Sequence, residues 1–223
     1  MGTTLELKQV SPYLLDKIKK SPELVGIFLE AKYLEDSEFW QQFTINSNDI
    51  DDVEWFNEAT NYVQERLDKL VKDKPKEFEK IQNDIPLVIN EGKNKYLDLD
   101  KTWLPINFLL TGYDFYDKAL YLPKSVVNKN PEDHLPLIRA VSPSNGIEYD
   151  GCDYPLYYFS DGEVKTIANA LSDFSLEHIR QRLEFRGLKE DSYNHLFNYT
   201  YNPLIRYYQD AADKGNAMFL DFG

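Results

Sequence analysis

The amino-acid sequence predicts an α+β fold with one small mixed or antiparallel sheet, several covering helices and more helix than strand. Residues 3–10 alternate between apolar and polar side chains, as a half-buried strand does. Residues 216–222 alternate with the same period, and a strand at a chain end is usually tied into a sheet. Helical patterns fill most of the chain between these strands, so both chain ends are expected to join one sheet packed by helices.

The stretch 96–112, YLDLDKTWLPINFLLTG, is predicted to be the central core element. It begins with alternating polar residues and then places apolar side chains along one side of a helix: Trp103, Ile106, Leu109 and Leu110. We expect Asp98 or Asp100 to cap this helix by accepting backbone N–H groups. A paired-carboxylate site is the alternative interpretation of these two acids. Gly112 stands where a helix end favours a residue that tolerates positive φ.

Serine and proline mark the first helices of the chain. Ser11-Pro12 and Ser21-Pro22 each place a capping residue before a proline at the first helical position. Two helices are therefore expected after the N-terminal strand.

Residues 35–94 are predicted to be a helical excursion within a single domain that spans residues 1–223. The clearest amphipathic helix covers 51–73, where apolar residues recur every three or four positions. Pro75 begins a shorter helical piece that ends near Pro86 and Gly92. Because the apolar face of this region is one-sided, it needs the rest of the protein to cover it.

The C-terminal half carries clear local signals. Residues 154–159 are predicted to form a strand, and Ser160 with Glu163 matches a capping box that opens a helix. Asn202-Pro203 is predicted to cap a last helix, which Gly215 ends before the final strand.

The formal net charge of −13, from 38 acidic and 25 basic residues, limits the choice of partners. A field of this sign repels nucleic acid and anionic membranes, whereas it attracts a basic protein partner. The nearest basic stripe is interrupted by acids and is interpreted as a mixed, solvated helix face: Arg180, Arg182, Arg186 and Lys189. The sequence therefore favours a possible basic protein partner and argues against nucleic acid and membrane partners.

The cellular compartment follows from a cysteine count and from missing apolar segments. Cys152 is the single cysteine, so no intrachain disulfide can form. The N-terminal residues lack the apolar core of a signal peptide, and no run approaches the roughly 20 apolar residues of a membrane span. A cytoplasmic location is expected.

Motifs for cofactors, metals and nucleophilic catalysis are missing. His134, His178 and His195 do not have metal-ligand spacing, and the glycines are too widely spaced for a phosphate loop. Cys152 lies between Asp150 and Asp153, a setting that disfavours a reactive thiolate. The sequence predicts no cofactor, no metal and no assigned catalytic residue.

Four segments together resemble the YfbM-like family, a bacterial domain of unknown function. In chain order they are MGTTLELKQVSPYLLDKIKKSPELVGIFL, YLDLDKTWLPINFLLTG, PLIRAVSPSNGIEYDGCDYPLYYFSDGEVKTIANAL and YYQDAADKGNAMFLDFG. The helical excursion at 35–94 is the least similar part. The resemblance implies the α+β fold and no assigned reaction. Family members tend to carry a histidine where this chain has Asn107, and an amide does not titrate near neutrality.

Two functions remain open at this point. The first is a non-enzymatic acidic binding protein, for example an immunity-type inhibitor of a basic toxin or nuclease. The second is an enzyme with a pocket assembled from non-adjacent residues around the central helix at 98–112. Asn107 would orient its substrate and Arg139 would hold an anionic group. The candidate pocket residues are Asp100, Trp103, Asn107, Thr111, Arg139 and Tyr158.

Overall fold

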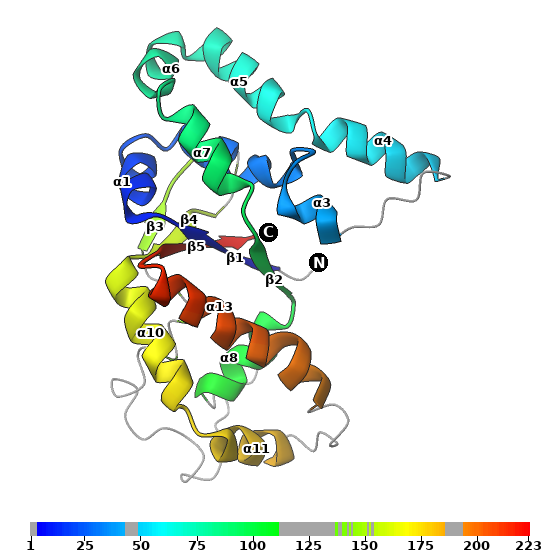
Figure 1. The fold of residues 1–223 in the computed structure, drawn as a ribbon, viewed down its shortest axis with the longest axis vertical. Helices are drawn as coiled ribbons and strands as arrows, with labels where there is room; N and C mark the ends of the chain where they lie inside the picture. The colour runs from blue at the N-terminus through cyan, green and yellow to red at the C-terminus, as the bar shows by residue number, and fades with distance from the viewer. Residues whose placement is uncertain are drawn as a thin grey trace. The chain divides into compact units, whose positions relative to one another are not determined.

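The structure is a computed structural model that describes residues 4–42, 49–111, 145–150, 154–185 and 194–223, together with positions 137, 140, 141, 143 and 152. The fold is α+β with more helix than strand among these residues, as the sequence predicts (Figure 1). The chain divides into two compact units. The first is Met1–Lys8, Leu97–Gly146 and Tyr157–Gly223, and the second is Gln9–Tyr96 with Ile147–Leu156.

Five strands form a sheet in the order β2-β1-β5-β4-β3. Their bounds are Leu5–Val10 (β1), Tyr96–Asp100 (β2), Asn145–Ile147 (β3), Leu156–Phe159 (β4) and Ala217–Phe222 (β5). β4 and β5 are antiparallel, with Tyr158 opposite Phe219. The Thr4 N–H donates to the Gly223 carbonyl at 2.9 Å, and the Gly223 N–H donates back to Thr4 at 3.3 Å. The prediction that both chain ends join one sheet is confirmed.

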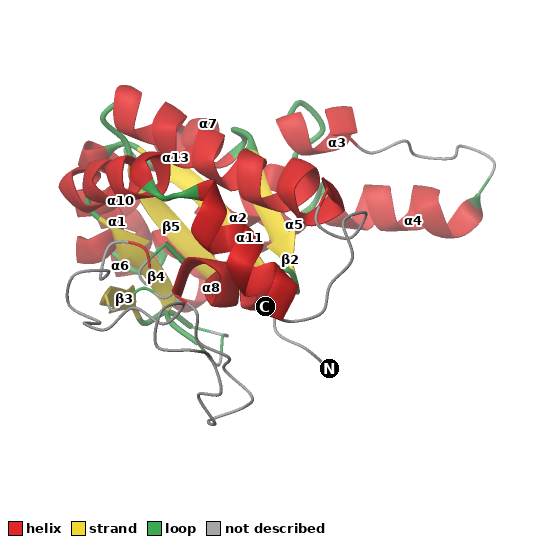
Figure 2. Ribbon diagram, turned by 90° about the horizontal axis from the view of Figure 1, so that it is seen from below, coloured by secondary structure: helices red, strands yellow, loops and turns green. Residues whose placement is uncertain are grey.

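Helices cover one face of this sheet in the first unit (Figures 1 and 2). They are α8 (Trp103–Thr111), α10 (Asp161–Asp173), α11 (Leu176–Phe185) and α13 (Asn202–Asp213), the last preceded by a π-helical turn, η3 (Phe197–Tyr201). α10 and α13 pack against each other and against β5. Ile106, Leu109 and Leu110 of α8 are at most 1 % exposed and share a core with Leu5 and Leu220. Residues 103–111 therefore form the interior helix that the apolar pattern predicts.

Two predicted caps in this unit are wrong. Asp98 and Asp100 belong to β2, and the Asp98 carboxylate accepts a hydrogen bond from the Asp100 N–H at 2.7 Å, in a turn where Asp100 has φ 42°. α8 begins only at Trp103, so Thr102, and neither acid, stands at its N-cap position. Asn202 is not a cap, because the helix is continuous from η3 into α13. Pro203 lacks an N–H, and the wider π-turn before it accommodates the lost bond.

Arg182 also corrects an interpretation, because it does not lie on a solvated face. Its side chain is 1 % exposed, it donates to the Leu109 carbonyl, and its guanidinium lies 5.2 Å from the centre of the Phe174 ring. Burial lowers the pKa of Arg182 to about 10. Its neighbours Ile179 and Leu183 are core residues, so this side of α11 faces inward. Arg180 is exposed, whereas Arg186 and Lys189 lie outside the described residues.

The second unit is helical. Its elements are α1 (Pro12–Lys20), α2 (Leu24–Glu30), the 3-10 turn η1 (Ala31–Tyr33), α3 (Glu38–Gln42), α4 (Ile50–Ala59), α5 (Tyr62–Asp73), α6 (Pro75–Ile81) and α7 (Ile85–Gly92). Ser11 caps α1 as predicted, since its Oγ accepts from the Leu14 N–H at 3.1 Å. Glu91 in turn accepts from both the Ser11 N–H and its hydroxyl, each at 2.7 Å. α2 packs against both α5 and α7.

Three boundaries in this unit differ from prediction. α2 begins at Leu24 rather than directly after Ser21, whose carbonyl accepts from the Leu24 N–H. Pro86 lies in the first turn of α7 and does not end a helix. The single helix predicted over 51–73 is two helices, because the Thr60 hydroxyl and the Asn61 amide donate to carbonyls at the end of α4.

Candidate functional site

The predicted pocket residues on α8 differ widely in exposure. Asp100 is exposed at the end of β2, whereas Asn107 is 4 % exposed within the core-facing helix. Trp103 is half-buried and packs edge-on against Phe222, with ring centroids 5.4 Å apart. Thr111 is the last residue of α8. Its side chain and Arg139 lie outside the described residues.

Tyr158 lies on the other face of the sheet from Trp103. Tyr157 packs on Phe222 at 5.6 Å, as Trp103 does, and it contacts the core of the first unit. Successive side chains of a strand point to opposite faces, so Tyr158 faces away from that core together with its partner Phe219. The structure thus brings Trp103 close to the sheet but does not bring it together with Tyr158.

A cluster of aromatic side chains lies in the second unit, where α3, α4 and η1 meet. Its members are Tyr33, Phe39, Trp40, Trp55, Phe56, Tyr62 and Tyr96, packed around Ala59. Trp40 makes edge-on contacts with Trp55 at 5.1 Å and Phe56 at 4.7 Å, and its indole N–H donates to the Tyr33 carbonyl at 2.8 Å. The Lys32 ammonium lies 5.0 Å from the centres of the Tyr33 and Tyr96 rings, a cation–π arrangement. This cluster fixes α3 against α4.

Helix α4 combines this aromatic face with a strongly acidic one. Asp49 caps it by accepting from the Asp51 N–H at 3.1 Å, so the acids of residues 49–54 lie at the positive end of the helix. Four acids follow within the helix, which contains no lysine or arginine: Asp51, Asp52, Glu54 and Glu58. Ala59 is the one buried residue of α4, while Val53, Trp55 and Phe56 are half-buried and Ile50 is 73 % exposed. A helix of this kind presents both charge and apolar area to a partner.

A pocket of about 540 Å³ lies entirely within the second unit. It is lined by residues in and just before α2, by residues of α5 and its C-cap, and by the segment that follows β3: Pro22, Glu23, Gly26, Arg66, Lys69, Leu70, Asp73, Lys74, Glu148, Tyr149 and Asp150. Charged side chains of both signs and apolar groups, among them Pro22 and Leu70, together form its walls. That composition suits a small ligand that carries charge as well as apolar atoms.

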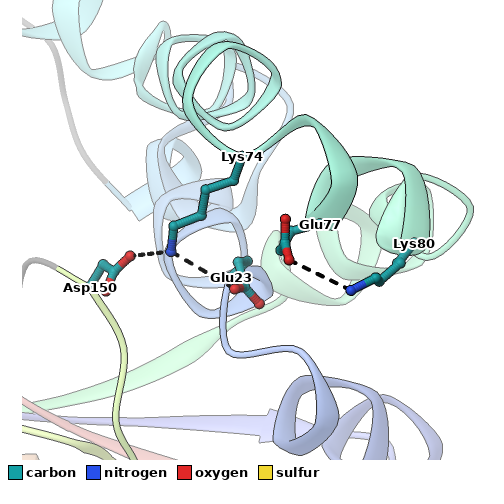
Figure 3. A network of polar contacts seen from close by, with 5 residues as sticks. All are labelled: Glu23, Lys74, Glu77, Lys80 and Asp150. Atoms are coloured by element: carbon teal, nitrogen blue, oxygen red, sulfur yellow. Dashed lines mark hydrogen bonds and ion pairs between the residues drawn. The ribbon is translucent and has the colours of Figure 1, made fainter.

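Lys74, at the end of α5, is the best-paired cation of the pocket (Figure 3). Its ammonium lies 2.5 Å from the Asp150 carboxylate and 3.9 Å from that of Glu23. The hydrogen bond between Lys74 and Asp150 raises the pKa of the lysine and lowers the pKa of the aspartate. Figure 3 also shows the separate Glu77–Lys80 pair on α6, at 3.6 Å.

Arg66 is held in place by Glu30 and by a glycine. Its guanidinium donates to the Glu30 carboxylate, and this bond raises the pKa of Arg66. A Cβ on Gly26 would lie 2.5 Å from three atoms of the guanidine group, so the glycine provides the space that Arg66 occupies. The buried Nε–H of Arg66 finds no acceptor among the residues that the structure describes.

Sequence reasoning missed this pocket. Its lining comes from three segments that are far apart in the chain, and none of them carries a recognised motif. Two signals pointed towards it: a glycine in the middle of the α2 pattern, and charged residues one helical turn apart at Lys69 and Asp73.

Two further structural findings bear on function. Among the described residues, no three His, Cys, Asp or Glu side chains gather closely enough to hold a metal ion. Within the same part of the chain, none of the helices combines the length and apolar character that a bilayer crossing requires.

Comparison with known proteins identifies the family. The profile of a domain of unknown function, DUF1877, matches residues 60–220. The chain belongs to the DUF1877 family. The crystal structure of YfbM from Escherichia coli, a protein of unknown function, is 21 % identical over 68 % of this chain and 94 % of its own, with a TM-score of 0.39. No curated protein matches the chain.

The resemblance to a YfbM-like family is thereby confirmed. The DUF1877 match begins after α4, and it leaves out the N-terminal strand and first helices, which the sequence resemblance included. The pocket residues of α5 and of 148–150 lie within the matched range.

Proposed function

We propose that this protein is a non-enzymatic cytoplasmic binding protein that recognises a basic protein partner through α4. The observation that carries the proposal is the composition of that helix: five acids, counting its cap Asp49, and no basic residue, above half-buried Val53, Trp55 and Phe56. Electrostatic attraction speeds the encounter with a basic partner. Aromatic side chains such as Trp55 are enriched among the residues that contribute most to binding energy.

The net charge of −13 supports the same proposal, because it extends the attraction beyond one helix. An immunity-type inhibitor of a basic toxin or nuclease is one concrete form of such a partner pair. α4 precedes the residues matched by the family profile, so this binding surface would be a feature of this chain rather than of the matched domain.

A charge-reversal pair on α4 tests the proposal. Glu54 and Glu58 are exposed and one turn apart, so Glu54→Lys with Glu58→Lys changes the charge of one face by four units. The matched control is Glu79→Lys with Glu184→Lys, two exposed glutamates on α6 and α11 that give the same change in net charge elsewhere.

The three proteins serve as baits in extracts of the source organism, with bound proteins quantified by mass spectrometry at low and high salt. A basic partner is expected on the unaltered protein and on the control. Its recovery should fall at least about tenfold on the α4 variant and at high salt, because the attraction is screened. Equal capture by both variants, or no basic protein at low salt, would refute the proposal.

A further inference from the structure

Several charges in the pocket between α2, α5 and residues 148–150 lack an ion-pair partner among the described residues. Lys74 is bound to Asp150 and Glu23, and Arg66 to Glu30. The ammonium of Lys69 and the carboxylates of Asp73 and Glu148 make no ion pair within the described part of the chain. The pocket thus offers one more cation and two more anions to a ligand.

These charges are ordered along α5. Arg66, Lys69 and Asp73 follow one another at intervals of three and four residues, so they line one face of the helix. The cations come first and the anion one turn later. At 1.5 Å per residue, Asp73 lies about 6 Å further along the helix axis than Lys69. An extended chain of two amino acids spans about 7 Å, which matches this separation.

Arg66 gives the cationic end a fixed geometry. The Glu30 carboxylate holds the guanidinium against α2, at the position that Gly26 leaves open. The Arg66 side chain is still 38 % exposed, and a positioned, partly exposed guanidinium is the usual partner of a carboxylate.

We propose that this pocket binds a small zwitterion of dipeptide length, with its carboxylate at Arg66 and Lys69 and its ammonium at Asp73 and Glu148. The volume of about 540 Å³ falls within the range of small-molecule sites. The site is separate from the acidic face of α4 and does not depend on the partner proposed for that face.

Ligand-detected NMR tests this proposal with alanyl-alanine, glutamyl-alanine and lysyl-alanine as probes. Each is compared with its N-acetylated and its C-amidated form, which keep one terminal charge apiece. At least one unblocked dipeptide is expected to bind, and blocking either end should weaken its binding about tenfold because one charge-assisted contact is lost. Failure of all three to bind at millimolar concentration, or equal binding of the blocked forms, overturns the proposal.

A pair of variants on α5 locates the binding. Lys69→Gln removes a pocket charge, whereas Lys72→Gln removes an exposed charge on the same helix that does not line the pocket. The first should weaken dipeptide binding about tenfold and the second should leave it unchanged. Far-UV circular dichroism of both variants checks that the fold is kept. If both substitutions weaken dipeptide binding equally, the dipeptide does not bind at Lys69. The charge reversal on α4 (Glu54→Lys with Glu58→Lys) is expected to leave dipeptide binding intact.

Discussion

At the residue scale, Gly92 packs so closely against the backbone of α2 that it leaves no room for a side chain. A Cβ at this position would lie 2.6 Å from the Phe28 carbonyl oxygen and 2.7 Å from the Ala31 Cβ. Backbone atoms cannot rotate away, so α7 and α2 would have to separate. Gly92→Ala is expected to lower the free energy of unfolding by about 2 kcal/mol in urea denaturation.

Gly162 provides the control for that substitution. It lies in α10, and nothing stands within 4 Å of a Cβ built there. Gly162→Ala should therefore raise the free energy of unfolding by about 0.5 kcal/mol, through the better helix propensity of alanine. Similar effects of the two substitutions would show that the contact at Gly92 is not as close as described.

Tyr208 predicts a dependence of stability on alkaline pH. Its hydroxyl is fully buried and donates to the Ala140 carbonyl at 2.7 Å, and burial raises its pKa well above 10. The folded protein therefore holds this proton more firmly than the unfolded chain. The resulting stability is complete below pH 10 and is lost as the pH rises above it.

Tyr208→Phe tests this dependence. The loss of the hydrogen bond should cost about 1 kcal/mol at pH 7. Above pH 10 the stability of the variant should fall less steeply than that of the unaltered protein, because the variant lacks this proton. Urea denaturation at several pH values measures both effects, and the difference between the two proteins cancels contributions from other groups, such as Arg182. If the free energy of unfolding fell equally with pH in both proteins above pH 10, Tyr208 would not be the group responsible.

At the element scale, local sequence signals predict helix starts well when the capping partners are neighbours. The capping box at Ser160 is confirmed: its Oγ accepts from the Glu163 N–H, and Glu163 accepts from the Ser160 N–H at 2.9 Å. The end of α13 at Gly215, with φ 66°, is confirmed for the same reason. Each of these features depends on residues within one turn.

The break between α4 and α5 shows where periodicity fails. Phe56, Ala59 and Val63 continue the helical spacing across the break, so the apolar pattern contains no interruption. The helix ends because the side chains of Thr60 and Asn61 bond to backbone carbonyls of Phe56 and Asn57. Polar side chains of this kind compete with backbone N–H groups for the helix carbonyls. The spacing of apolar residues gives no sign of this competition.

Ser160→Ala measures the value of the capping box. The substitution should lower the free energy of unfolding by about 1 kcal/mol. The Glu163 N–H loses its acceptor, and the Glu163 carboxylate is held less firmly against the Ser160 N–H. Thr166→Ala is the matched control, because Thr166 lies on the exposed side of the same helix and donates only to the Gly162 carbonyl. Its effect should stay within about 0.5 kcal/mol. A cost at Thr166 equal to that at Ser160 would argue against the cap.

At the scale of the whole molecule, the sequence predicts the sheet but not the pocket. The alternating strands at both chain ends can be recognised locally, because the period of two appears within each short segment. The pocket instead requires Gly26, Lys69 and Glu148 to meet, and their separations in the chain leave no periodic trace. The predicted pocket around Asn107 rested on a helix whose apolar composition already indicated a core position. Sites assembled from distant segments depend on tertiary packing that one sequence does not display.

The same sheet yields a prediction about the C-terminus. β5 lies between β1 and β4, and Phe222 contacts both Trp103 and Tyr157. Phe222→Ala should lower the free energy of unfolding by about 2 kcal/mol, since the side chain is only half-buried. Deletion of Asp221–Gly223 should cost about 1 kcal/mol more, because the hydrogen bonds between Thr4 and Gly223 are lost as well. Urea denaturation followed by tryptophan fluorescence measures both. A deletion without cost would mean that the last residues behave as an ordinary frayed end and do not tie the two chain ends together.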